Sequence, residues 1–201
     1  MKKAAVGFRV HSGWAAMVAV SLEKGAPAVL VRERVHLVKT FTYESRQPYH
    51  TAAKLEPKEA RAFVAHIRKE ARGLALRAIR GLREKLEEHG YALGRSAILM
   101  ASGRPLPPLP KILEAHSLIH TADGELFREA LIHASKRCGL ENSTAKERDL
   151  PDAASRALRK KPTHLSRRIT ELGRGLGPPW SQDEKMAALA AWYALAANSP
   201  S

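Results

Sequence analysis

Three runs of apolar residues open the chain and predict three strands in series. They cover Ala4 to Val10, Trp14 to Leu22 and Ala28 to Val38. The segments between them, 11–13 and 23–27, contain the glycine or proline that hairpin turns need. We therefore expect an antiparallel meander. Its second strand is almost wholly apolar and should be central, whereas its third alternates polar and apolar positions and should lie near an edge.

The remainder of the chain alternates between helical and strand-like patterns. Apolar residues recur at every third or fourth position from Pro57 to His89, which predicts a long helix that breaks or bends at Gly73 and Gly81, or projects beyond the sheet. The short apolar run Ser96–Met100 predicts a buried parallel strand. The later elements are expected to be a helix that ends at Gly139, a short strand over 143–146, basic helices over 151–172 and a last helix that begins at a capping box over 181–184.

Two segments show neither the helical nor the strand period of apolar residues and are expected to be loops. Thr40 to Leu55 contains a proline and several aromatic residues, and the segment after Gly103 is rich in proline. A proline-rich segment is stiff and extended. If the protein is an interaction scaffold, we expect this segment and the aromatic stretch Tyr43 to His50 to form its contact surface.

The chain is strongly basic, which favours anionic partners such as nucleic acid. Lysine and arginine outnumber aspartate and glutamate by 34 to 20, for a net charge of +14. An ordinary basic surface would give the same composition, so charge alone does not assign a partner. The candidate nucleic-acid-binding residues are Arg9, Arg61, Arg68, Arg72, Arg80, Arg83, Arg156, Arg159, Lys160, Lys161, Arg167 and Arg168.

Length and cysteine usage limit the class of protein. The single cysteine, Cys138, excludes an internal disulfide and zinc sites built on cysteine pairs, which fits a reducing compartment. The longest apolar run, Met186–Ala197, has about 12 residues, and roughly 20 are needed to cross a bilayer. We therefore expect a cytoplasmic protein without a membrane span. A length of 201 residues suits a single domain over 1–198 with a basic helical insertion at about 151–175.

Two short motifs and the order of elements resemble a known family. Residues Val6 to Ala15 are similar to the first strand and glycine turn of Holliday-junction resolvases, a branch of the ribonuclease H-like superfamily. Residues Asp183 to Ala190 resemble the alanine-rich terminal helix of those resolvases. The resemblance implies an α/β fold: a mixed sheet of a three-stranded antiparallel meander plus two short parallel strands, flanked by helices.

The chain departs from that family at the residues that bind metal. The resemblance implies an aspartate in the first strand that helps to hold two Mg²⁺ ions about 4 Å apart, and this chain has Arg9 there. A second carboxylate is implied at or just after the fourth strand, where the chain reads Met100 to Gly103. Only Asp183 stands where the family places a metal ligand. A catalytically degenerate protein that binds nucleic acid is therefore our first hypothesis, and Asp183 or Glu125 is the expected partner of Arg9.

A second hypothesis is a metal-dependent nuclease or phosphodiesterase with a relocated site. The densest cluster of catalytic residue types lies in a loop that leads into a helix and comprises His116, His120, Thr121, Asp123 and Glu125. Asp123 and Glu125 could coordinate Mg²⁺ together with Asp183, and His120 could act as a general base. The plainer interpretation is that Asp123 and Glu125 are acidic residues at a helix N-terminus, where negative charge is favoured. The histidine spacing gives no recognised zinc motif.

Overall fold

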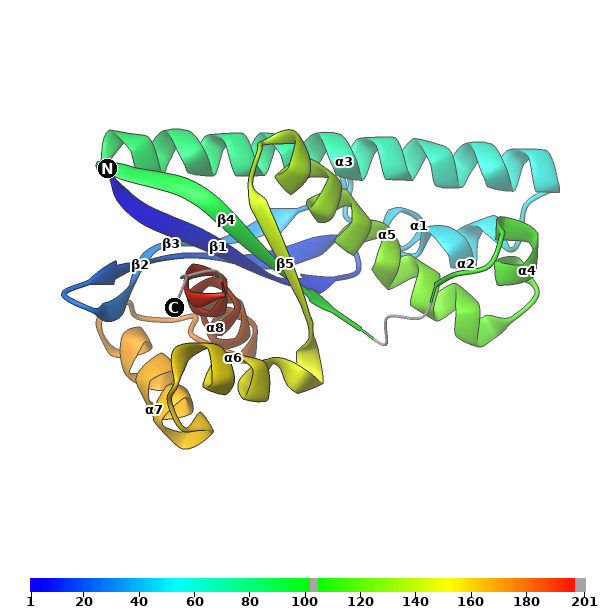
Figure 1. Cartoon of the computed structure of the whole chain (residues 1–201). Coiled ribbons are helices and arrows are strands. Elements are labelled where there is room, and N and C mark those ends of the chain that lie inside the picture. The colour runs from blue at the N-terminus through cyan, green and yellow to red at the C-terminus, as the bar shows by residue number, and fades with distance from the viewer. Residues whose placement is uncertain (102–104, 198–201) are drawn as a thin grey trace.

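A five-stranded mixed sheet forms the centre of the protein (Figure 1). The structure is a computed structural model and describes residues 1–101 and 105–197. The strand order is β3-β2-β1-β4-β5; the first three strands are antiparallel, and β4 and β5 run parallel to β1. The strands are β1 (Lys2–His11), β2 (Trp14–Glu23), β3 (Ala26–His36), β4 (Tyr91–Met100) and β5 (Glu141–Lys146). The predicted meander, the central β2 and the edge position of β3 are confirmed.

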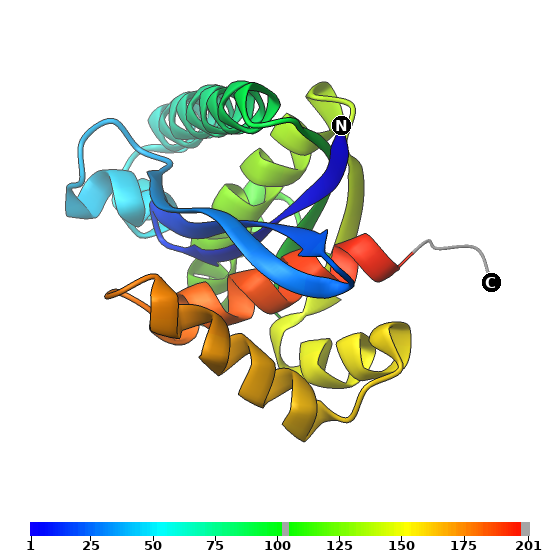
Figure 2. The ribbon, with the colours of Figure 1, turned by 90° about the vertical axis from the view of Figure 1, so that its left-hand side faces the viewer.

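Helices cover both faces of the sheet (Figure 2). On one face lie α3 and α5, and on the other lie α8 and, beyond it, α6 and α7. The helices are α1 (Tyr43–Arg46), α2 (Pro48–Ala52), α3 (Pro57–Glu88), α4 (Leu109–Leu113), α5 (His116–Arg137), α6 (Leu150–Leu158), α7 (Pro162–Leu172) and α8 (Gln182–Ala196), with 3-10 turns η1 (Glu147–Asp149) and η2 (Gly173–Gly175).

The alternation of side chains along β1 divides the core into two layers. Val6, Phe8 and Val10 pack into the layer of α3 and α5, whereas Ala5 packs into the layer of α8. Gly7 also faces α8, and a Cβ atom there would lie 2.0 Å from the carbonyl oxygen of Ala187. The backbone of α8 therefore rests directly on β1, which fixes the helix close to the sheet.

The long helix α3 is continuous over 32 residues. At a rise of about 1.5 Å per residue it is about 48 Å long. The glycines at which we expected a break, Gly73 and Gly81, do not interrupt it. Its first half extends past the sheet, where α1, α2 and α4 pack near it (Figure 1). The expected projection of this helix is therefore correct, and the projecting end supports a small group of short helices.

Three sequence-based boundaries were wrong. The expected loop Thr40 to Leu55 contains α1 and α2, which are too short to show a helical period. Helix α5 begins at His116, so His120, Asp123 and Glu125 lie within the helix and not in a loop; Ala115 at its N-cap gives no side-chain capping signal. Strand β4 begins at Tyr91, five residues before the apolar run.

Two further expectations concern residues that the structure does not describe. The predicted carboxylate position at the end of β4 includes Ser102 and Gly103, and the predicted end of the domain, 198, begins the terminal segment; both lie outside the described residues. Among the helices that the structure describes, none is long and apolar enough to cross a bilayer.

Candidate functional site

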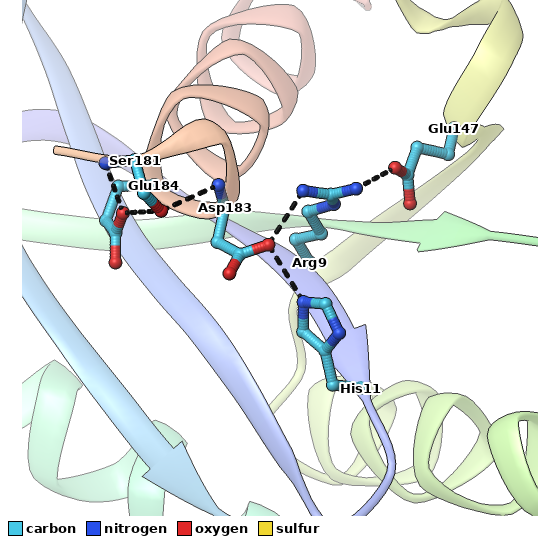
Figure 3. A network of polar contacts seen from close by, with 6 residues as sticks. All are labelled: Arg9, His11, Glu147, Ser181, Asp183 and Glu184. Atoms are coloured by element: carbon cyan, nitrogen blue, oxygen red, sulfur yellow. Dashed lines mark hydrogen bonds and ion pairs between the residues drawn. The ribbon is translucent and has the colours of Figure 1, made fainter.

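The carboxyl end of β1 and the first turn of α8 meet at one edge of the sheet. Arg9 and His11 alternate with Val10 along β1, so they lie on the face that α8 covers. The predicted capping box forms at the start of α8: the backbone N–H of Asp183 donates to Ser181 Oγ at 3.2 Å, and the N–H of Ser181 donates to Glu184 at 2.8 Å. The cap fixes the first turn of the helix beside β1 (Figure 3).

The guanidinium of Arg9 lies between two carboxylates. Nη1 donates to Asp183 Oδ1 at 2.7 Å, Nη2 donates to Glu147 of η1, and His11 Nε2 lies 2.8 Å from the same Asp183 oxygen (Figure 3). Burial alone would lower the pKa of Arg9, but the hydrogen bond to Glu147 and the two carboxylate charges outweigh it and raise the pKa above its ordinary value. The expected Arg9–Asp183 pair is therefore confirmed, and Glu147 is a partner that the sequence did not indicate.

A stack of flat side chains continues from this network onto the surface. The rings of His11 and Trp14 are stacked with centroids 4.4 Å apart, and the guanidinium of Arg34 lies 3.8 Å from the centroid of Trp14. His11 and Trp14 are cross-strand partners on either side of a two-residue turn in which Gly13 has a φ of 83°. We missed this stack, although the two-residue turn is visible in the sequence and determines the pairing.

An open hollow of about 730 Å³ lies where β4 and β5 end. Its lining includes Met100 at the end of β4, Glu147 after β5 and Thr121 on α5. Glu147 therefore both lines this hollow and forms an ion pair with Arg9. The carboxyl edge of the sheet, where ligands bind in many open α/β sheets, is therefore accessible from the Glu147 side.

The carboxylates of the relocated site lie apart. Asp123 is buried in the layer of α3 and α5, where it accepts the N–H of Tyr49 at 2.7 Å and contacts His50 Nδ1 at 2.5 Å. Burial raises the pKa of Asp123, and these two hydrogen bonds oppose the rise. Glu125 pairs with Arg128 at 3.2 Å. Asp183 belongs to the opposite layer, so the structure does not assemble the three carboxylates as that hypothesis requires.

Several of the candidate arginines are used within the protein. Arg68 and Arg72 of α3 pair with Glu129 of α5, and Arg83 donates to the carbonyl oxygen of Cys138. These three side chains are half-buried and join the two helices, so together with Arg9 they are not free for phosphate groups. Of the candidate arginines on α3, Arg61 and Arg80 are exposed.

The basic candidates of α6 and α7 remain on the surface. Arg156, Arg159, Lys160 and Lys161 are exposed, and within the described chain none of the four lies in an ion pair. The exposed Arg167 pairs with Glu171 at 2.9 Å, and the half-buried Arg168 is near the same carboxylate. A surface hollow of about 550 Å³ at the start of α7 is lined by Lys160, Lys161, Thr163, His164 and Arg167.

The sheet order and the helices on both faces define a ribonuclease H-like fold, and comparison with solved structures gives the same class. The structure is similar to "T. thermophilus RuvC in complex with Holliday junction substrate", with a TM-score of 0.53 and 12% identity over 94% of this chain and 91% of that chain. Another Thermus thermophilus RuvC structure gives a TM-score of 0.48 at 14% identity, over 94% and 92% of the two chains. An exopolyphosphatase from Cytophaga hutchinsonii gives 0.37 at 11% identity, over 79% and 38%.

No protein-family model matches the sequence, and no curated protein has significant sequence similarity to it. The likeness to RuvC, at 12% identity, establishes the fold. What the chain does must therefore be argued from its own side chains.

Proposed function

We propose that this chain is a nucleic-acid-binding module that does not cleave its ligand by the two-metal mechanism of its fold class. The observation that carries the proposal is the position of Arg9 between Asp183 and Glu147. Mg²⁺ needs carboxylate oxygens that are free to coordinate it, and a guanidinium repels it. The guanidinium of Arg9 therefore provides the positive charge at this edge of the sheet, and the carboxylates of Asp183 and Glu147 neutralise it.

Two observations support nucleic acid as the ligand. The similar RuvC structure holds a Holliday junction, so the fold is compatible with duplex and branched DNA. Arg156, Arg159, Lys160 and Lys161 form an exposed group of cations on α6, its C-terminal end and the linker to α7, and none of them has an ion-pair partner among the described residues. Phosphate groups bind such cations and release counterions, so this binding weakens steeply with salt.

Arg159 has a left-handed backbone conformation, which is uncommon for a residue other than glycine. It is the C-cap of α6 with a φ of 51°, in the left-handed region that glycine occupies most easily. An arginine there costs backbone strain, and its side chain makes no ion pair within the described chain. A phosphate contact from this exposed guanidinium would account for the residue type.

The test is a fluorescence anisotropy titration of labelled single-stranded, duplex and four-way-junction DNA at two salt concentrations, with and without Mg²⁺, followed by a gel of the products. We expect salt-sensitive binding and intact DNA. Replacing Arg159, Lys160 and Lys161 by glutamine should reduce the salt slope by about 2 to 3, since each phosphate contact contributes about 0.9.

The matched control replaces three exposed lysines outside this group, Lys3, Lys24 and Lys136. It removes the same charge and should leave most of the affinity. Equal losses in the two triple variants would reject the assigned surface. Mg²⁺-dependent cleavage by the unmodified protein, or no binding to any of the three DNAs, would reject the proposed function itself.

A further inference from the structure

Three histidine side chains converge at the projecting end of the molecule. His50 comes from α2, and His116 and His120 come from the first two turns of α5. The ring centroids are 4.4 Å apart for His50 and His120, 4.5 Å for His116 and His120, and 5.4 Å for His50 and His116. One ring nitrogen of each lies within 4.8 Å of the other two. These nitrogens are neutral-ligand donors of the kind that transition metals prefer.

The two histidines of α5 have the spacing of a chelating pair. Residues four apart on a helix lie on the same face, and the Nε2 atoms of His116 and His120 are 3.0 Å apart. Two nitrogens bound to one tetrahedral zinc ion at about 2.0 to 2.1 Å are about 3.3 Å apart. The pair therefore needs an adjustment of only a few tenths of an ångström to hold one ion. The sequence contains this signal, but it is meaningful only if the helix begins at His116.

The third histidine is oriented by a buried carboxylate. His50 Nδ1 lies 2.5 Å from Asp123 Oδ2, and the other oxygen of Asp123 accepts the N–H of Tyr49. Asp123 is 1% exposed, so this arrangement is part of the packed interior and not a chance surface contact. Because Nδ1 is engaged, Nε2 is the nitrogen that His50 offers to a ligand. A carboxylate that hydrogen-bonds a metal-binding histidine in this way fixes the ring and strengthens the ligand.

We propose that His50, His116 and His120 bind one Zn²⁺ ion and that Asp123 is the positioning residue for His50. Three imidazoles suit zinc and do not suit Mg²⁺, which prefers oxygen ligands. His116 and His120 are exposed, so a fourth coordination position is open to water or to a ligand. The cluster lies in the layer of α3 and α5, on the other side of the sheet from the Arg9 network.

The experiment uses the whole 201-residue chain without a polyhistidine tag, stripped with a chelator and titrated with Zn²⁺ in competition with a chromophoric chelator. We expect one Zn²⁺ per chain. His116→Gln and His120→Gln remove exposed ligands without disturbing the core, and each should weaken binding by at least about tenfold. The control, His66→Gln on the exposed surface of α3, should bind as the unmodified protein does.

A second readout tests the coordination geometry and the positioning role. Co²⁺ in place of Zn²⁺ should give the intense visible absorption of a four-coordinate ion, and both α5 variants should lose it. Asp123→Asn should weaken Zn²⁺ binding by about 10- to 100-fold while the stoichiometry stays at one. The proposal is overturned if the unmodified protein binds Zn²⁺ no more tightly than the His116→Gln/His120→Gln double variant, or if His66→Gln loses as much affinity as they do.

Discussion

Arg9 and Asp183 are separated by 174 positions in the sequence and joined by a hydrogen bond of 2.7 Å between Nη1 and Oδ1. The bond ties a central strand to the first turn of the last helix. Glu147 attaches the end of β5 to the same guanidinium. Three distant parts of the chain therefore depend on one charged side chain at the edge of the sheet.

Removing the arginine should destabilise the protein. Loss of one partner costs about 3 to 5 kcal/mol at a fully buried ion pair. We expect about 1 to 3 kcal/mol for Arg9→Met, because 20% of the Arg9 side chain is exposed and water screens the charges left behind. Urea unfolding measures the change. The double variant Arg9→Met/Asp183→Asn should recover part of the loss, and strictly additive single effects would show that the two residues are not coupled.

Exchanging the arginine for a carboxylate should create a cation site. In Arg9→Asp, three carboxylates of residues 9, 147 and 183 would share the place of the guanidinium, and their repulsion is relieved by a bound divalent ion. We expect millimolar Mg²⁺ to raise the Tm of this variant by several degrees and to leave the Tm of the unmodified protein almost unchanged. Arg9→Asn, which adds no charge, is the control. An equal Mg²⁺ effect on the unmodified protein would contradict the assigned role of Arg9.

Arg159→Gly should separate stability from binding. Glycine adopts the left-handed C-cap conformation of residue 159 without strain, so stability should be unchanged or should rise by up to about 1 kcal/mol. The affinity for DNA should fall, because an exposed cation is lost. Thermal unfolding and the anisotropy titration measure the two effects on the same preparation. An unchanged DNA affinity would mean that Arg159 contacts no phosphate.

Gly7→Ala should disturb the contact between β1 and α8. The new Cβ atom would lie 2.0 Å from Ala187 O and 2.6 Å from Ala191 N, which are backbone atoms and can move only with the helix. Overpacking of this kind costs about 1 to 3 kcal/mol. Gly81→Ala on α3 is the matched control, since nothing lies within 4 Å of its added methyl group and alanine favours the helix by about 1 kcal/mol. Equal stability of the two variants would argue against close contact at Gly7.

Glu23 should contribute stability that acid removes. Its pKa is lowered by the hydrogen bond from Lys2 at 2.5 Å and then by that from Tyr91 at 2.9 Å. A carboxylate with a lowered pKa stabilises the fold above its unfolded pKa, and this contribution is lost as the pH falls through the folded pKa. The stability difference between the unmodified protein and Glu23→Gln should therefore be constant near neutral pH and shrink below about pH 4. A stability difference that grows in acid would contradict a lowered pKa for Glu23.

The sequence predicted the features that depend on local pattern. The three strands of the meander follow from apolar runs and turn residues, and the start of α8 follows from Ser181 and Glu184. A charge inside a strand needs a partner, and the sequence offered Asp183 or Glu125 for Arg9; the structure shows Asp183. Glu147 could not be predicted, since it lies in a single 3-10 turn that has no sequence signature.

The histidine cluster depends on tertiary structure. His50 and Asp123 are 73 positions apart, and their contact exists only because α2 packs against α5 beneath the projecting end of α3. The sequence pattern predicts a loop at His120 and Asp123, and in a loop the four-residue spacing of His116 and His120 does not place the two side chains on one face. A helix whose N-cap is Ala115 gives no polar capping residue to mark its beginning.

The division of the core into two layers also decides what intrinsic fluorescence can report. The chain has three tryptophans, and Trp14, Trp180 and Trp192 all pack in the layer of α8. Their emission therefore reports on that half of the molecule alone, whereas far-ultraviolet circular dichroism also includes α3 and α5. If the two signals unfold at the same urea concentration, the layers melt as one unit; separate midpoints would make the sheet a boundary between two cooperative units.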